Sequence, residues 1–306
     1  MYEHTALEIL SVREVDIPIQ QITRRKWLND LQRALIFDPI ERIALDMRRV
    51  PVMEYVFRSP IETDIAENNV GHVRHYRGSG ERSVILLPQK SRGYNFAQCL
   101  AQYFASAGID AWEVETPLRG SRLPAGIVDV GQLPFSAERL HDTVDQAVQE
   151  ARGIADLVPG QVGICGISLG AIYASIAYGI DQRFDAGCLL LGGGDLSGMV
   201  QSSHDSLATN IRKHVMENGY TQQEIDATFA AIEPCNYTDH ERTHGLMLVN
   251  AASDRIIPRH HGNMLWESWG RPRRYVLGGG HLSVARRALE MFPKIRQHFM
   301  SGAPCN

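Results

Sequence analysis

The stretch QVGICGISLGAIYASIAYGI, residues 161–180, decides how the rest of the chain is interpreted. Its first eight residues are mostly apolar and predict a buried strand, whereas the Ala-rich part after Ser168 predicts a helix. Where the two meet, Gly166 to Gly170 read Gly-Ile-Ser-Leu-Gly, with Ser168 at the centre. A tight strand-to-helix turn of this kind projects the serine hydroxyl beyond the edge of the sheet, and the glycines remove Cβ atoms that would collide. Ser168 is therefore a candidate nucleophile; the alternative is a Gly-rich turn in which it only caps the helix.

Strand-like and helix-like segments alternate along most of the chain. Two runs, 52–59 and 70–77, predict an antiparallel opening pair of strands. After them, short apolar runs alternate with longer helical patterns such as 137–158, which predicts a mainly parallel, doubly wound α/β sheet. The apolar runs that we interpret as its further strands are 83–88, 110–117, 161–168, 184–193, 245–253 and 273–279.

Two segments fall outside this alternation. Residues 194–243 contain helical patterns near 205–218 and 222–232 but no convincing strand, and such an insertion between sheet strands predicts a helical lid. Near the N-terminus, apolar positions spaced by three and four over 24–49 predict two amphipathic helices. We therefore divide the chain into an N-terminal helical extension and an α/β domain that carries the lid, with bounds 1–51 and 52–306.

The composition excludes several classes of protein. A formal net charge of -4 over 306 residues, with no basic run, gives no reason to expect nucleic acid as a partner. No stretch approaches the ~20 apolar residues of a membrane span, and the acidic N-terminus does not resemble a signal peptide. The cysteines are widely spaced without a C-x-x-C pair, and Cys165 and Cys188 fit buried free thiols. The expected location is therefore a reducing cytoplasm.

A serine hydroxyl needs a base, and His281 is the best-placed candidate. It follows the glycines 278–280 directly after the last predicted strand, so the backbone can turn sharply and return the imidazole over the sheet. The histidine in turn needs a carboxylate that accepts its other N–H and fixes its tautomer. Asp254, at the end of an earlier strand, is the preferred acid, and Asp195, after the strand before that one, is the rival. A turn or capping role is the alternative for such an aspartate.

The order Ser168, Asp254, His281, with a strand before each, resembles the α/β-hydrolase superfamily over about residues 70–300. The strand-Asp-Arg-Ile-Ile-Pro segment is similar to that of esterases and dienelactone-hydrolase-like enzymes. The resemblance implies an α/β-hydrolase fold and hydrolysis of a small-molecule ester through an acyl-enzyme. Thioester hydrolysis, acyl transfer and C–C bond cleavage use the same groups. A catalytically idle binding protein is the alternative from another class.

The resemblance also implies an oxyanion hole built from backbone N–H groups. One donor is the N–H of Leu169, directly after the nucleophile. The second follows the third strand, where the familiar His-Gly motifs are absent and Gln89 or Lys90 is the expected donor.

Candidate substrate contacts come from the loops after residues 88 and 117 and from the lid. Four cations in these loops could attract an anionic group of the substrate, although solvated surface is the alternative; they are Lys90, Arg92, Arg119 and Arg122. Tyr94 lies in the first of these loops. In the lid, Met216 and Phe229 are the expected apolar contacts, unless the lid helices only pack onto the body.

No metal or cofactor site is expected. Adjacent His260 and His261 would point to different sides of a helix, so they cannot easily share one ion. The Gly triplets at 192–194 and 278–280 lack the G-x-G-x-x-G spacing of a dinucleotide site.

Overall fold

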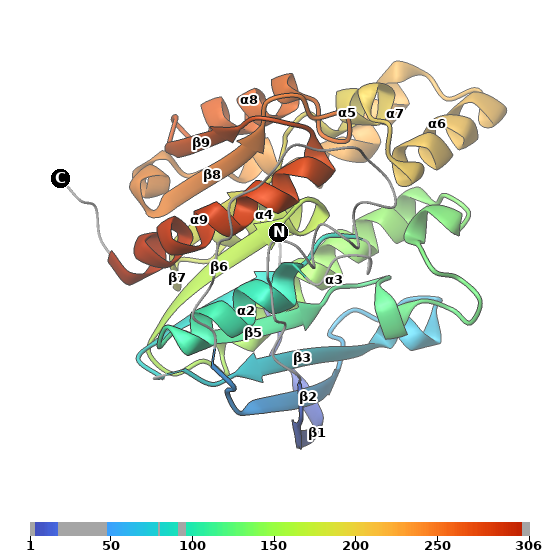
Figure 1. Cartoon of the computed structure of the whole chain (residues 1–306). Helices are drawn as coiled ribbons and strands as arrows, with labels where there is room; N and C mark the ends of the chain where they lie inside the picture. The colour runs from blue at the N-terminus through green and yellow to red at the C-terminus, as the bar shows by residue number, and fades with distance from the viewer. Residues whose placement is uncertain (1–3, 18–47, 79, 91–95, 302–306) are drawn as a thin grey trace.

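The computed structural model describes residues 4–17, 48–78, 80–90 and 96–301. They form a nine-stranded sheet with helices on both faces (Figure 1). The strand order is β1-β2-β3-β5-β4-β6-β7-β8-β9. The strands span Glu8–Val15 (β1), Val52–Arg58 (β2), Val70–Tyr76 (β3), Arg82–Leu87 (β4), Asp110–Glu115 (β5), Gln161–Ile167 (β6), Phe184–Leu190 (β7), Leu246–Ala251 (β8) and Arg273–Leu277 (β9).

Most of the sheet is parallel. From β5 through β4, β6, β7 and β8 to β9, neighbouring strands run in the same direction. Strands β1, β2 and β3 extend the β5 edge with antiparallel pairing. The central strands β4, β6, β7 and β8 are buried along nearly their whole length, as strands covered on both faces must be. The predicted strands are present, and β2 and β3 form the predicted antiparallel pair.

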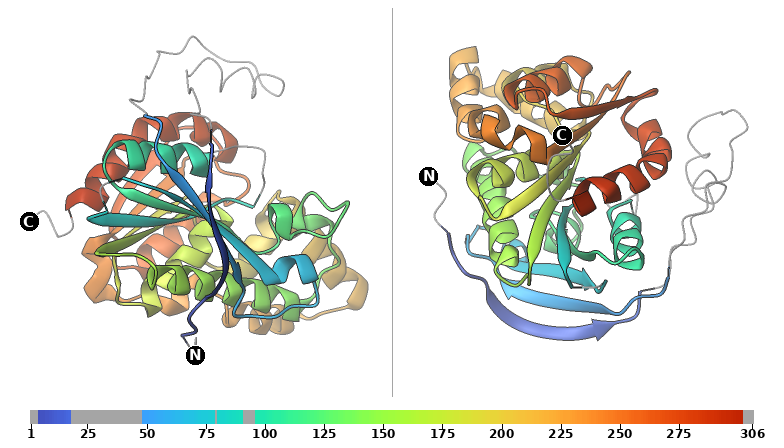
Figure 2. Two further views of the ribbon diagram at one scale, coloured as in Figure 1. Left: turned by 90° about the horizontal axis from the view of Figure 1, so that it is seen from below. Right: turned by 90° about the vertical axis from the view of Figure 1, so that its left-hand side faces the viewer.

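Helices cover the sheet in two layers (Figure 2). The layer on one face comprises α2 (Phe96–Ser106) and α9 (His281–Ser301), and the other comprises α3 (Ala137–Ala155), α4 (Leu169–Ile180) and α8 (Arg259–Ser268). Alternate side chains of one strand serve both layers. On β4, Ile85 packs in the core beneath α3 and α4, whereas Val84 packs in the core beneath α2 and α9.

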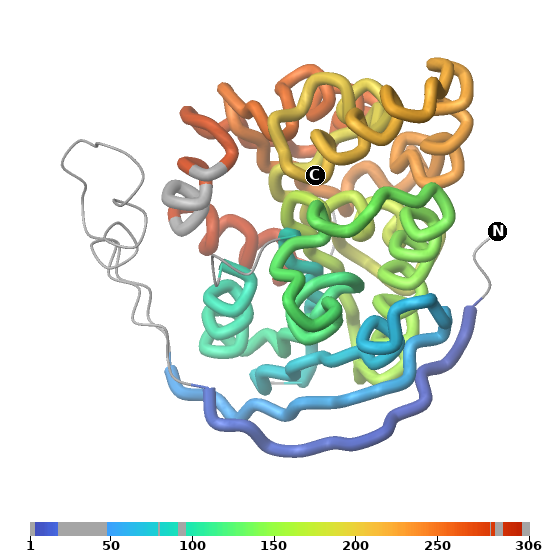
Figure 3. The backbone as a smooth tube through the Cα atoms, turned by 90° about the vertical axis from the view of Figure 1, so that its right-hand side faces the viewer, coloured from blue at the N-terminus to red at the C-terminus, as the bar shows by residue number. Residues whose placement is uncertain are grey.

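The insertion between β7 and β8, residues 194–243, is the predicted lid, which we call the cap. It contains α5 (Leu196–Ser202), α6 (Ser206–Asn218), α7 (Gln222–Ala230) and the 3-10 helix η4 (Pro234–Tyr237), and η5 (His240–Gly245) leads into β8. The predicted cap helices correspond to α6 and α7; α5, only seven residues long, was not predicted. The cap lies beside the chain between β5 and α3 (Figure 3), which carries η2 (Gly120–Arg122) and η3 (Val130–Gln132). The remaining 3-10 helix, η1 (Ala66–Asn69), precedes β3.

The N-terminal segment differs from the helical extension that the sequence predicted. Residues 8–15 form strand β1, which pairs with β2 and completes the edge of the sheet. A domain boundary after residue 51 would therefore separate β1 from its own sheet. The helices predicted over 24–49 lie mostly outside the described residues.

The sequence predicted buried free thiols at Cys165 and Cys188. Cys99, Cys165 and Cys188 are buried free thiols. Within the described ranges, no helix combines the length and the apolar character that crossing a bilayer requires.

Candidate active site

Ser168 occupies a tight turn between β6 and α4. Its backbone has φ 54° and ψ −116°, and a positive φ of this kind costs a non-glycine residue roughly 1–3 kcal/mol. Close backbone contacts explain the flanking glycines. A Cβ on Gly166 would lie 2.2 Å from the Gly170 carbonyl oxygen, and a Cβ on Gly170 would lie 2.1 Å from that of Leu87. The G-x-S-x-G pattern is therefore a steric requirement of this turn.

His281 reaches Ser168 from the start of α9. The loop before it turns through Gly279, whose φ is 109°. Backbone hydrogen bonds from Ala252 N to Leu277 O (2.8 Å) and from Ser253 N to Gly279 O (2.9 Å) join this loop to the segment after β8. His281 Nε2 lies 3.0 Å from Ser168 Oγ. The imidazole is thus within hydrogen-bonding distance of the serine hydroxyl.

Asp254 contacts the other side of the same imidazole. Its Oδ2 lies 2.7 Å from His281 Nδ1. Its Oδ1 accepts hydrogen bonds from the backbone N–H groups of Ile256 (2.8 Å) and Ile257 (2.9 Å). The carboxylate is buried and oriented through both oxygens, as a group that fixes a histidine tautomer needs to be.

The rival carboxylate, Asp195, has a different role. It caps α5 by accepting a hydrogen bond from Gly198 N at 3.1 Å, and its Oδ2 lies 3.5 Å from His261 Nδ1. The structure therefore brings Asp254, and not Asp195, to His281.

The backbone groups expected at the oxyanion hole lie around the same turn. Leu169 is the first residue of α4, where backbone N–H groups have no partner within the helix. A Cβ on Gly170 would lie 2.5 Å from Pro88 O, so the backbone after β4 is packed against the serine turn. Leu169, Gln89 and Lys90 all line the cavity that contains Ser168.

A cavity of about 420 Å³ lies over Ser168 and His281. One wall is the cap, and the facing wall runs from residue 129 into α3. Most of the side chains in these walls are apolar: Val130, Leu133, Pro134, Phe135, Leu140 and Val144 on one side, and Leu196, Met199, Val200, Leu207, Ala208, Ile211, Phe229 and Ile232 from the cap. A pocket of this size and character suits a small organic molecule.

Some of the predicted substrate contacts line the cavity, and one does not. Phe229 lies in the cavity wall and is buried, and Arg119 also lines the cavity. Met216 is 82% exposed and is not a lining residue, because α6 turns its other face inward; the prediction that Met216 contacts substrate is wrong. Arg92 and Tyr94 lie outside the described residues.

The predicted group of substrate-attracting cations is also corrected. Lys90 Nζ lies 2.9 Å from both carboxylate oxygens of Asp205 and 3.3 Å from Asp129 Oδ1, so its charge is already balanced. Arg122 is fully buried and pairs with Glu150. Neither cation is available to bind an anionic substrate.

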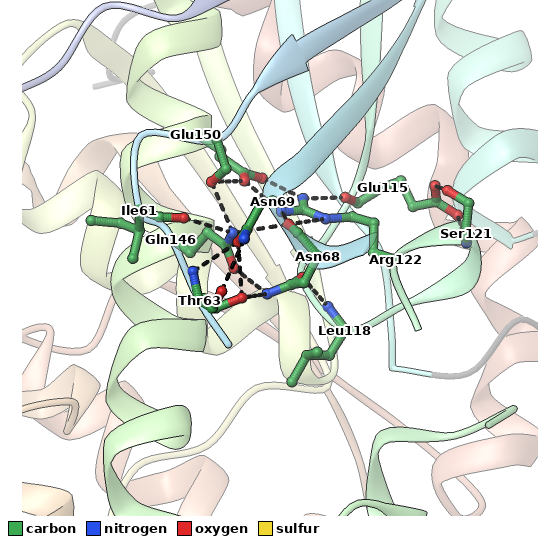
Figure 4. Close-up of polar contacts among 11 residues, drawn as sticks. Ile61, Thr63, Asn68, Asn69, Glu115, Leu118, Ser121, Arg122, Gln146 and Glu150 are labelled. Carbon is green, nitrogen blue, oxygen red and sulfur yellow. Dashed lines mark hydrogen bonds and ion pairs between the residues drawn. The ribbon is translucent and has the colours of Figure 1, made fainter. Parts of the chain in front are cut away.

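The buried pair belongs to a network of polar contacts that Figure 4 shows. Arg122 donates to Glu150 at 2.6 and 2.7 Å, and to the carbonyl oxygens of Glu115 (2.9 Å) and Asn68 (2.6 Å). Asn68 Oδ1 in turn accepts a hydrogen bond from Leu118 N at 2.9 Å. Leu118 lines the cavity with a φ of 51°. The network thus holds a strained part of the wall in place.

Burial shifts the pKa values of two further side chains near the site, Tyr173 and His261, toward their uncharged forms. Burial raises the pKa of Tyr173 by more than the charge of Arg122 lowers it, so this cavity-lining phenol stays protonated. Burial lowers the pKa of His261, which lies 2.8 Å from Ser202 Oγ and joins α8 to the cap. Across the described parts of the chain, no three His, Cys, Asp or Glu side chains gather in a way that could hold a metal ion.

Sequence reasoning missed part of the cavity lining. Leu196, Met199 and Val200 come from α5, which is too short to give a periodic signal. The wall at 129–136 carries only a 3-10 helix and gives no periodic signal. Leu140 and Val144, which also line the cavity, lie within the helix that the sequence predicts over 137–158.

Sequence comparisons find distant relatives. No family model matches the chain. The uncharacterized protein YdjC of Bacillus subtilis is 32% identical over 74 residues, which cover 24% of this chain and 64% of that protein. An uncharacterized protein of Mycobacterium tuberculosis is 27% identical over 169 residues, which cover 53% of this chain and 39% of that protein. The matches therefore span less than two thirds of the length of either relative.

Solved structures identify the fold. The acetyl xylan esterase from Paenibacillus sp. R4 superposes with a TM-score of 0.56 at 14% identity, covering 92% of this chain and 96% of that one. A cold-adapted esterase from an Arctic intertidal metagenomic library gives a TM-score of 0.53 at 14% identity and covers 82% and 96%. A puromycin-hydrolyzing peptidase of Mycobacterium tuberculosis gives 0.56 at 13% identity and covers 88% and 51%. The chain has the α/β-hydrolase fold.

Proposed function

We propose that this protein is a serine hydrolase that cleaves a small-molecule carboxylic ester through an acyl-enzyme on Ser168. The observation that carries the proposal is the continuous contact from Ser168 Oγ through the His281 ring to Asp254 beside an apolar cavity. The esterases among the structural neighbours support the same class of reaction.

The chemistry follows from these contacts. His281 Nε2 takes the proton of Ser168 as Oγ attacks the carbonyl carbon, and Asp254 stabilises the imidazolium through Nδ1–H. The N–H of Leu169 and that of Gln89 or Lys90 bind the developing oxyanion. His281 then protonates the departing alcohol. A water molecule, which gives its proton to His281, next attacks the acyl carbonyl carbon, releases the acid and restores Ser168.

The cavity favours an uncharged, apolar substrate group. Its walls are mainly aliphatic and aromatic, and a volume of about 420 Å³ is within the range of small-molecule pockets. The Lys90 charge is balanced within the protein and Arg122 is buried, so these two of the predicted cations do not support recognition of an anionic substrate. We therefore expect an apolar acyl or alcohol group of moderate size.

The test is covalent labelling combined with a substrate screen. A fluorophosphonate should label the wild type on Ser168, and Ser168→Ala should abolish labelling and lower kcat by roughly 10⁴–10⁶. Ser202 Oγ also lies 2.8 Å from a histidine nitrogen, but Ser202 itself should not react. Ser202→Ala is therefore the matched control, and the fluorophosphonate should label it on Ser168 as it labels the wild type. Esters, thioesters and lactones should be compared, because the same groups can serve each. Absence of labelling on Ser168, or more than about a tenth of wild-type activity in Ser168→Ala, would overturn the proposal.

A further inference from the structure

The side chain of Lys90 connects three separate segments above the active site. Its Nζ lies 2.9 Å from each carboxylate oxygen of Asp205, 2.6 Å from Ser206 Oγ and 3.3 Å from Asp129 Oδ1. The Lys90 side chain is only 13% exposed. An ammonium group has three donors, and all of them have acceptors here. The loop after β4, the cap and the facing wall therefore meet at one cation.

Each acceptor is itself fixed at the start of a helix. Asp205 caps α6 by accepting a hydrogen bond from Leu207 N at 2.8 Å, and Asp129 caps η3 through Gly131 N at 2.8 Å. Ser206 Oγ donates to Asp129 Oδ1 at 3.1 Å and so links the two acceptors. The side chains of Asp129 and Asp205 that bind Lys90 are thus each held by a hydrogen bond at a helix start.

The backbone of Lys90 belongs to the stretch expected to complete the oxyanion hole. The two residues directly before this stretch pack on the serine turn, because a Cβ on Gly170 would meet both Leu87 O and Pro88 O within 2.5 Å. Loss of the Lys90 contacts would therefore release both the cap and the backbone beside Ser168. We infer that Lys90 is a positioning residue, whose ion pairs with Asp129 and Asp205 hold the cap over the cavity and the second oxyanion donor in place. The inference rests on the proposed hydrolysis.

A second lysine in the cap provides a matched control. Lys213 lies on α6 and pairs with Glu217 at 3.8 Å, with the two side chains 71% and 60% exposed. Exposed pairs of this kind contribute little, whereas a nearly buried cation with several acceptors costs more to release. Lys213→Met should therefore match the wild type in every measurement below.

The first measurement is steady-state hydrolysis of p-nitrophenyl acetate, an ester with a short acyl group. Lys90→Met should lower kcat about 10- to 100-fold with KM within about twofold, a smaller loss than the ~10²–10³ for complete removal of an oxyanion donor. Asp205→Asn should lower kcat in the same direction, because asparagine keeps the helix cap but loses the charge. Lys90→Arg should restore most of the rate.

The second measurement is hydrogen exchange, which does not depend on activity. Lys90→Met should speed exchange at 205–211 and 129–133 and leave 291–299 in α9, outside the cap, unchanged. Wild-type or raised kcat together with unchanged exchange would overturn the inference. If the wild type shows no Ser168-dependent hydrolysis, the proposed function and the catalytic part of this inference fail, and exchange alone decides whether Lys90 holds the cap.

Discussion

Replacement of Asp254 by asparagine should abolish most activity without disturbing the fold. Asp254 Oδ1 accepts hydrogen bonds from Ile256 N and Ile257 N at 2.8 and 2.9 Å. An asparagine must keep its amide oxygen toward these two donors, so its NH₂ group faces His281 Nδ1 at the position where Oδ2 now lies 2.7 Å away. Nδ1 must then accept a hydrogen bond, and the imidazole proton moves to Nε2. A protonated Nε2 cannot take the proton of Ser168.

The expected loss is about 10⁴-fold in kcat, as for the same change in another serine hydrolase, or about 5 kcal/mol of transition-state stabilisation. The assay is ester hydrolysis with the enzyme concentration set by its folded fraction. Asp195→Asn is the control, because asparagine caps a helix as well as aspartate does and should leave kcat nearly unchanged. Retention of more than about a tenth of the activity in Asp254→Asn, or an equal loss in Asp195→Asn, would refute the reasoning.

Three further changes test the walls and the turn. Arg122→Met should lower the free energy of unfolding in urea by about 3–5 kcal/mol, because it leaves Glu150 buried without its partner, and a loss below about 1 kcal/mol would contradict this. Phe229→Ala should change the kcat/KM ratio between long and short acyl esters by about 1–3 kcal/mol. Met216→Ala is the control and should leave the ratio unchanged. Equal ratios in the two variants would mean that Phe229 of the cap does not contact the substrate. Gly170→Ala should lower both melting temperature and kcat, because the new Cβ would lie 2.1 Å from Leu87 O, and a variant with wild-type values would mean that the turn can open.

The sheet and the three site residues could be predicted because each depends on local pattern. Apolar runs mark buried strands, and the carboxyl ends of parallel strands meet at one edge. Ser168, Asp254 and His281 each follow such a strand, so their chain positions alone bring them together.

Other features depend on contacts between distant segments. Met216 and Ile211 are both apolar and lie on one helix, but at five residues apart they face directions roughly 140° apart, and only tertiary packing decides which face is buried. Lys90 and Arg122 lie after β4 and β5, in the loops that the sequence predicted. Whether their charge is available depends on Asp205 and Glu150, which lie far away in sequence. The sequence did not predict strand β1, because this edge strand is formed through its pairing with β2.

The most direct test of the account is to trap the acyl-enzyme. The wild type should be mixed with a p-nitrophenyl ester, quenched in acid within the first turnovers and digested, and the mass of the peptide that carries Ser168 should be measured. The account predicts a mass increase equal to the acyl group on Ser168, absent from Ser168→Ala, and a burst of p-nitrophenol that matches the amount of enzyme. Hydrolysis that continues with Ser168 unmodified, or an acyl group found on another residue, would contradict it.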